Sequence, residues 1–413
     1  MQKRFLLLLS VLFVQMALMQ PAGAVDAVSL QGSGSSFVAP VMAKWTENFG
    51  NVSTGPVQIS YASVGSGTGK ANFIAGTTDF AGSDAPLSST EVATITGNGQ
   101  VALTMPDTIG AIVMIYNITT GLTGTLNLTA QNIADIYQGT VTHWNDSTLT
   151  VNNPGLTSTA AIVQVHRSDS SGTSFAFSNF LTLSTGWSVG TTQDLSSLGG
   201  VGGSHNDGVA GAVSNNANSI GYVELNYAMQ NSLGYANVKN KDGNFVTATS
   251  AGIAAAAAAV ATSLPAGDGN WSSVSINWAS GADTYPIATF TYLMVYKDMS
   301  DSTWGTTGPS LVAFLHWLMT DDAQNLATPL GYIPLPTAVR TLNNATINSI
   351  SVTGNYMDYW PGASESSSAT GTGSTSASSS TSDSTAPGFE FISVALVFVA
   401  GTVIANKRRN NKN

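Results

Sequence analysis

Short apolar segments that suit β-strands alternate along the chain with amphipathic segments that suit helices. The first example is a strand-like segment beginning at Val28, a Gly/Ser turn, and a helix over 38–50 whose apolar residues recur at helical spacing. Residues 57–76 and 161–183 repeat the same order of strand, turn and helix. This alternation is typical of α/β proteins with mostly parallel sheets.

Two further segments, AIVMIYN (111–117) and TFTYLMVY (289–296), are apolar at almost every position. Such segments suit strands at the centre of a sheet or strands that cross between lobes. A chain of 413 residues, 43% hydrophobic and only 9% charged, is globular and long enough for two lobes with cores of their own. Because cysteine is absent, disulfides, thiolate metal sites and a cysteine nucleophile are excluded.

Both ends of the chain carry targeting patterns. Residues 1–24 have a basic start, an apolar run and small residues at the end, which predicts a signal peptide. Residues 359–386 are rich in Ser and Thr, which predicts a flexible stalk. In 387–413 an apolar run precedes three basic residues, which predicts a membrane anchor with its basic end inside, and the alternative is a buried C-terminal core helix.

The predicted layout places the body of the protein at the cell surface, on the outer face of the cytoplasmic membrane, anchored at the C-terminus. Asn-x-Ser/Thr sequons agree with an extracellular glycoprotein. They begin at Asn51, Asn117, Asn127, Asn145, Asn270 and Asn344.

The body between the two terminal signals is strongly acidic. Its seven Lys and Arg residues stand against 22 Asp and Glu residues, which gives a net charge of −15. This excludes nucleic-acid binding through counterion release and anion capture by a positive surface potential. A small anion remains a possible ligand if local dipoles bind it.

Three loops of Gly, Ser and Thr precede the three predicted helices: residues 32–37, 65–69 and 170–175. A helix start presents free N–H groups and the positive end of the helix dipole, glycine permits close approach of the backbone, and hydroxyls add donors. Ser, Thr and Gly are also ordinary capping and turn residues. Three such loops together with the pair Arg167 and Asp169 favour an anion site.

Motifs for other chemistry are weak. GWSVG (186–190) matches a nucleophile elbow but follows a predicted helix, and GSGTGKA (65–71) lacks the spacing and the Ser/Thr of a P-loop. The four histidines are scattered without a pair at i, i+4. We therefore expect no catalytic residue, no metal and no cofactor.

Six motifs follow one another along the chain: LQGSGSSFVAPVMAKW (30–45), GSGTG (65–69), TTDFAGSDAPLS (77–88), HRSDSSGTSF (166–175), SHNDGVAGAV (204–213) and SIGYVE (219–224). In these motifs and in their order the chain resembles the extracytoplasmic phosphate-binding proteins of Pst-type ABC importers, which have the two-lobed type II periplasmic-binding-protein fold. The resemblance implies an α/β protein that is not an enzyme, captures inorganic phosphate in a cleft between its lobes, and docks on the transmembrane subunits of an ABC permease. We expect lobe I to comprise 28–108 and 287–358 and lobe II to comprise 109–286, joined by crossing strands near 109–118 and 286–297.

The resemblance also implies a set of phosphate-binding residues. Asp84 would accept a hydrogen bond from the ligand, Arg167 would supply a guanidinium, and Asp169 would hold that guanidinium in place. The remaining residues would donate hydrogen bonds: Ser36, Phe37, Ser66, Ser171, Gly172 and Thr173. The chain departs from the family in having Ser36 where Thr is usual, Val38 where Pro is usual, and His166 where a second basic residue often precedes the arginine.

One carboxylate can select phosphate over sulfate. Phosphate carries at least one proton at neutral pH and sulfate carries none, so Asp84 would face sulfate as an unpaired like charge. Protonated arsenate offers the same pattern as phosphate and remains an alternative ligand. The alternatives of other classes are a phosphatase or esterase on the same scaffold and a structural or adhesive surface protein.

The C-terminal tail resembles archaeal carboxy-terminal sorting signals of the Pro-Gly-Phe type. A Ser/Thr stalk, the sequence PGFEF (387–391), an apolar segment and a basic end occur in that order. The resemblance implies that a sorting enzyme removes the apolar segment and that a lipid replaces it; otherwise residues 391–405 stay as the anchor.

Overall fold

The structure, a computed structural model, describes residues 27–362. The expected signal peptide (1–24), the expected anchor (387–413) and the expected stalk beyond residue 362 lie outside the described residues. Within 27–362, no helix is both long enough and apolar enough to cross a membrane.

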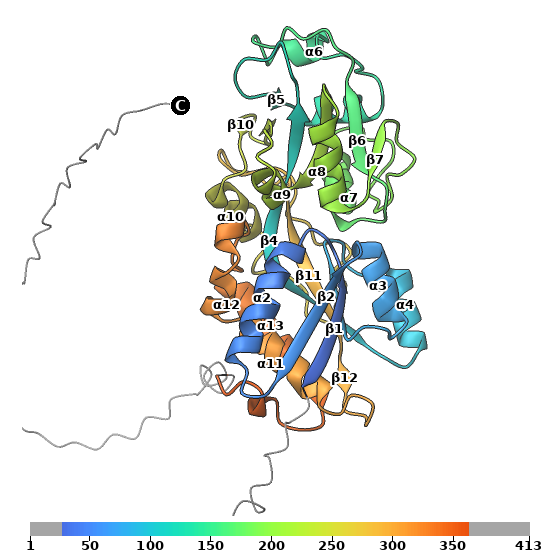
Figure 1. Cartoon of the computed structure of the whole chain (residues 1–413), viewed down its shortest axis with the longest axis vertical. Helices are drawn as coiled ribbons and strands as arrows, with labels where there is room; N and C mark the ends of the chain where they lie inside the picture. Colours follow the sequence, from blue (N-terminus) through green and yellow to red (C-terminus); the bar gives the residue numbers. More distant parts are fainter. Residues whose placement is uncertain (1–26, 363–413) are drawn as a thin grey trace, which may run out of the picture. The chain divides into compact units, whose positions relative to one another are not determined.

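Two paired antiparallel strands, β4 (Ala102–Asn117) and β11 (Ala288–Tyr296), form the centre of an eight-stranded sheet (Figure 1). The strands follow the order β2 (Val57–Ser63), β1 (Val28–Gly34), β3 (Phe80–Ser83), β11, β4, β8 (Ser219–Glu224), β6 (Val163–Arg167) and β7 (Val201–Gly203). We call strands β2, β1 and β3 sheet end I, and strands β8, β6 and β7 sheet end II.

Pairing is parallel within each sheet end and antiparallel at the centre. Strand β1 pairs parallel with β2 and β3, and β6 pairs parallel with β7 and β8. Strand β11 pairs antiparallel with β3, and β4 with β8. The expected parallel arrangement therefore holds within both sheet ends, whereas the centre departs from it because β4 and β11 run in opposite directions.

Helices pack on both sheet ends (Figure 1). Those that follow or cover sheet end I are α2 (Ala39–Val52), α3 (Ser66–Ile74), α4 (Ser89–Gly97), α11 (Thr307–Leu318), α12 (Asp321–Asn325) and α13 (Thr337–Ile347). Those between β4 and β11 in the chain are α5 (Ala130–Tyr137), α6 (Ser147–Thr150), α7 (Gly172–Ser184), α8 (His205–Asn215), α9 (Leu225–Gln230) and α10 (Ser250–Ala258). The smaller elements are β5 (Asn127–Leu128), β9 (Asn237–Lys239), β10 (Phe245–Val246), β12 (Asp298–Met299), β13 (Ser351–Val352), η1 (Thr328–Leu330) and η2 (Tyr356–Asp358).

The apolar spacing of α2 explains why this segment folds onto the sheet. Val41, Met42, Trp45 and Phe49 are buried on one face, as their helical spacing predicts. Burial of each such side chain stabilises the fold by about 1.5–3 kcal/mol. The Trp45 indole N–H also donates to the Ala323 carbonyl at 2.7 Å, which ties α2 to α12.

The central strands form the most continuous part of the core. All nine residues of β11 are buried, and so is every residue of β4 from position 103 to position 115. The register shifts where Thr291 pairs with Thr108 but Tyr292 pairs with Pro106, so Asp107 is the extra residue of a β-bulge. A bulge accommodates Pro106, which has no N–H to donate.

Candidate functional site

Each of the three Gly/Ser/Thr segments lies at a junction between a strand and a helix, as predicted, but residues 66–69 already belong to α3 and residues 172–175 to α7. The first joins β1 to α2, the second joins β2 to α3, and the third joins β6 to α7. Strands β1 and β2 are parallel neighbours, so their carboxyl ends reach the same edge of the sheet. Third-loop residues come from sheet end II, yet they contact the second loop and Asp84, as the following distances show.

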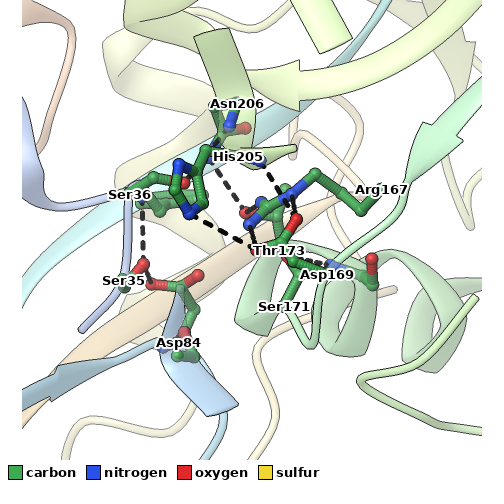
Figure 2. A network of polar contacts seen from close by, with 12 residues as sticks. Ser35, Ser36, Asp84, Arg167, Asp169, Ser171, Thr173, His205 and Asn206 are labelled. Carbon is green, nitrogen blue, oxygen red and sulfur yellow. Dashed lines mark hydrogen bonds and ion pairs between the residues drawn. The ribbon is translucent and has the colours of Figure 1, made fainter. Parts of the chain in front are cut away.

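The first loop is joined to Asp84, which follows β3. The Ser35 hydroxyl donates to Asp84 Oδ1 at 2.6 Å and accepts the Phe37 backbone N–H at 3.0 Å (Figure 2). Ser36 and Phe37 are buried. From the opposite side, the Tyr227 hydroxyl donates to the Ser36 carbonyl at 2.6 Å, so the loop is held through its carbonyl groups as well.

The second and third loops meet at Gly172, the first residue of α7. A Cβ atom at this position would lie 2.5 Å from Ser66 Oγ and 2.6 Å from Asp84 Oδ2. Only glycine therefore permits this approach. Nearby, the Gly67 N–H donates to the Ser170 carbonyl at 3.1 Å. The N-terminus of α7 thus lies directly against Asp84 and Ser66, which come from the other end of the sheet.

Arg167 and Asp169 form a two-point pair. Arg167 Nε donates to Asp169 Oδ1 at 2.8 Å and Nη2 donates to Oδ2 at 2.6 Å, while Nη1 donates to Thr173 Oγ1 at 3.2 Å (Figure 2). Arg167 is fully buried. Partial burial acts to raise the pKa of Asp169, but the hydrogen bonds and charge of Arg167 outweigh it and hold that pKa below its ordinary value. The guanidinium charge is therefore matched by an ionised partner, and the group acts mainly as a rigid set of donors.

Asp84 is the buried carboxyl of the site. Among residues 27–362 its Oδ2 atom has no hydrogen-bond partner, although Asp84 is only 1% exposed. Burial raises the pKa of Asp84 to about 7, against the opposing effects of the Ser35 hydrogen bond, the Arg167 charge and the Thr173 hydroxyl. An unpaired oxygen atom beside donor hydroxyls is the place where a ligand O–H group would be bound.

Ser171 caps α7. Its hydroxyl accepts the Ser174 N–H at 3.1 Å, and its own N–H donates to the Gln193 carbonyl at 2.9 Å. All nine residues expected to bind phosphate thus lie in or beside the three converging segments. Asp169, with 20% of its side chain exposed, is the least buried of them.

Three more residues join this network that the sequence did not assign to it. Ser35 bonds Asp84, the His205 N–H donates to Asp169 Oδ1 at 3.0 Å, and Asn206 bonds Ser36 and Thr173 (Figure 2). Ser35 adjoins a predicted residue, and His205 and Asn206 stand in the motif SHNDG. All three residues stand within motifs that carry the family resemblance, and this position is the sequence signal that could have identified them.

A buried polar group lies behind the first loop. The Tyr332 hydroxyl donates to the Phe37 carbonyl at 2.5 Å, and its oxygen lies 3.1 Å from Glu224 Oε2. Glu224 is fully buried, and that burial raises its pKa well above the ordinary range. These contacts connect the end of β8 and the segment after η1 to the loop that carries Ser36 and Phe37.

Comparison with known proteins identifies the family of this chain. A family model described as a PBP superfamily domain matches residues 20–322. The phosphate-binding protein PstS of Xylella fastidiosa is 37% identical over 318 residues, which cover 75% of this chain and 82% of that protein. The phosphate-binding protein PstS of Methanocaldococcus jannaschii is 30% identical over 337 residues, with 78% of this chain and 86% of that protein covered.

Solved structures show the same fold at lower identity. The phosphate-bound structure of the periplasmic phosphate-binding protein PfluDING has a TM-score of 0.61 and 22% identity, and it covers 77% of this chain and 93% of that chain. The phosphate-binding protein of Stenotrophomonas maltophilia has a TM-score of 0.56, also at 22% identity, covering 77% of this chain and 92% of that chain. The expected α/β fold of the two-lobed binding proteins is confirmed. The chain belongs to the PBP superfamily and, within it, to the family of the PstS phosphate-binding proteins.

Proposed function

We propose that this protein captures inorganic phosphate outside the cytoplasmic membrane and delivers it to an ABC importer. The names of its relatives support a binding protein rather than an enzyme. The observation that carries the proposal is Asp84, a buried carboxyl next to the hydroxyl groups of Ser35 and Ser66. Within residues 27–362 its Oδ2 atom has no hydrogen-bond partner, and the charge of Arg167 acts on it.

The proposed site comprises the residues that the resemblance implies. Ser36, Phe37, Ser66 and Asp84 would contact the anion from sheet end I. Arg167 and residues 171–173 would contact it from sheet end II, with Asp169 behind the arginine. Hinge motion between lobe I (28–108 and 287–358) and lobe II (109–286) would admit and enclose the ligand. The closed form would then dock on the transmembrane subunits of the permease.

Selection of phosphate over sulfate follows from the number of protons that each anion carries. An ionised Asp84 accepts a hydrogen bond from a phosphate O–H group, whereas sulfate has no proton to offer. Leaving a buried charged group unpaired costs about 1–3 kcal/mol or more. Because arsenate carries protons as phosphate does, it should compete for the site.

The decisive experiment is calorimetric titration of Asp84→Asn with phosphate and with sulfate. We expect phosphate affinity to fall about 10- to 100-fold, because the amide N–H would point at the ligand proton. Sulfate affinity should rise, because no carboxylate repels it. An unchanged preference for phosphate over sulfate would contradict the role of Asp84.

Asp107→Asn is the matched control. Asp107 is also buried, and its Oδ2 also lacks a partner in the described part of the chain, but its other oxygen accepts from the Thr291 hydroxyl in the central strands. This variant should bind phosphate like the unmodified protein. If neither protein shows saturable phosphate binding, a structural or adhesive role becomes the better account.

Anchoring at the C-terminus is part of the proposal and is supported by the sequence alone. Mass spectrometry of the protein isolated from membranes would distinguish a lipid anchor from a retained apolar anchor. A peptide that ends before residue 391 and carries a lipid supports the sorting signal. A chain that reaches Asn413 supports a retained apolar anchor.

A further inference from the structure

Two hydroxyl groups of the proposed phosphate shell share one buried neighbour. Asn206, the second residue of α8, is fully buried. Its Nδ2 atom donates to Ser36 Oγ at 3.0 Å and to Thr173 Oγ1 at 3.2 Å (Figure 2). Ser36 follows β1 and Thr173 lies in the first turn of α7, so one side-chain amide joins two loops from opposite ends of the sheet.

The orientation of this amide is fixed by the backbone. Asn206 Oδ1 accepts the Glu224 N–H at 3.0 Å, and a backbone N–H can only donate. The NH₂ group must therefore face the two hydroxyls. Both of its hydrogens and its oxygen are used, so the buried amide is fully satisfied.

These hydrogen bonds occupy the acceptor positions of both hydroxyl oxygens. A hydroxyl oxygen accepts two hydrogen bonds and donates one. Ser36 Oγ accepts from Asn206 Nδ2 and also from the Asn206 backbone N–H at 3.2 Å. Thr173 Oγ1 accepts from Asn206 Nδ2 and from Arg167 Nη1, each at 3.2 Å. Both acceptor positions of each oxygen are filled, so each O–H group can act only as a donor.

We propose that Asn206 is a positioning residue of the anion site. It holds the hydroxyl groups of Ser36 and Thr173 in the orientation in which they donate hydrogen bonds to bound phosphate. This inference rests on the proposed function, because it takes Ser36 and Thr173 to be phosphate-binding residues. It assigns no contact between Asn206 and the ligand. Without the amide, either hydroxyl could rotate and accept instead of donate. The amide thus favours a fully charged oxygen at these two positions over a ligand O–H group.

Asn206→Asp replaces the donating NH₂ group with an accepting carboxylate oxygen and leaves the shape of the side chain almost unchanged. The introduced carboxylate can only accept, so the two hydroxyls would turn toward it and away from the ligand. We expect phosphate affinity to fall about 100-fold or more in calorimetric titration, and about 10-fold for Asn206→Ala, which leaves the hydroxyls free to rotate.

Asn240→Ala is the matched control. Asn240 is a buried asparagine, and its Nδ2 donates to the carbonyl groups of Gly281 and Ala282 at 3.0 and 2.9 Å. These contacts lie within the proposed lobe II, so the variant removes no contact between the lobes. Thermal melting measured on every variant separates lost stability from lost affinity. Asn240→Ala should lower the melting temperature but change phosphate affinity less than about 3-fold, because the hydroxyl shell is intact.

A double-mutant cycle with Ser36→Ala and Thr173→Val tests whether Asn206 acts through the hydroxyls. When both hydroxyls are absent, Asn206→Ala should cost less than about 3-fold in affinity, because nothing remains for the amide to orient. A full 10-fold loss in that background, or an Asn206→Asp protein with unchanged affinity, would overturn the inference. Phosphate binding by the unmodified protein is measured alongside and tests the proposed function independently.

Discussion

At the scale of single residues, Asp84 and Asp107 are both buried acids, but one lies in the proposed phosphate site and the other in the central strands. Burial raises the pKa of each to about 7. Asp84 adjoins the hydroxyl groups of the loops, whereas Asp107 is the bulged residue of β4. Between its ordinary pKa of 3.8 and about 7, the folded state holds a proton on Asp107 that the unfolded chain has lost. Stability contributed by this residue is therefore lost as the pH rises through that range.

Asp107→Asn should remove this pH dependence. Relative to the unmodified protein without ligand, the free energy of unfolding of the variant should increase by about 1–3 kcal/mol from pH 5 to pH 7.5 and stay level above it. Urea denaturation at a series of pH values measures the difference. A difference that is constant with pH would show that the Asp107 carboxyl is not protonated in the folded state below pH 7.

The limits of sequence reasoning are clearest for individual residues. Arg167 and Asp169 are two positions apart, so their pairing could be expected from the chain itself. Ser35 meets Asp84 across 49 positions and Asn206 meets Ser36 across 170, and no local pattern encodes such contacts. Serine and asparagine are also ordinary turn and capping residues, which hides a role of this kind.

At the scale of elements, the N-terminus of α7 is the part of the site that depends most on close packing. Gly172→Ala would place a methyl group 2.5 Å from Ser66 Oγ and 2.6 Å from Asp84 Oδ2. The two sheet ends would have to separate, and we expect phosphate affinity to fall about 10-fold or more because the donor shell could not close. Isothermal titration and thermal melting would measure both effects.

Gly211→Ala in α8 is the control for that substitution. A Cβ at Gly211 would have no atom within 4 Å, so alanine should stabilise the helix by about 0.5–1 kcal/mol and leave affinity unchanged. If Gly172→Ala bound phosphate as tightly as the unmodified protein, α7 would not need to approach Asp84.

Most elements near the site could be predicted, because their signals are local. Helical spacing identified α2 by its buried face, and the Gly/Ser/Thr loops marked the starts of α3 and α7. The antiparallel centre could not be predicted, because strand direction depends on which distant strands pair. The bulge at Asp107 likewise depends on the register with β11.

At the scale of the whole molecule, a side-chain contact between Lys70 and Gln193 joins the two halves outside the proposed phosphate site. Buried Lys70 on α3 donates to Gln193 Oε1 at 2.7 Å and to Glu91 Oε2 at 2.9 Å. Gln193 follows α7, and its carbonyl holds the Ser171 N–H. The contact therefore stabilises the closed arrangement without touching the anion.

Gln193→Ala should weaken phosphate binding about 3- to 10-fold, mainly through faster dissociation, because the closed form loses a charge-assisted hydrogen bond. Stopped-flow measurement of phosphate release tests this. Gln138→Ala, which removes an exposed contact to Ser188, should release phosphate at the unmodified rate. Equal release rates for the two variants would contradict a closing role for Lys70 and Gln193.

The pairing of Arg167 with Asp169 has a consequence for how salt affects the protein. Because the cation is matched at short range, the acidic body repels an approaching anion until it reaches the donor groups. Added potassium chloride shortens the reach of that repulsion to about 8 Å at physiological ionic strength. Phosphate should therefore associate faster as salt increases, the reverse of what an anion receptor with a basic surface would show.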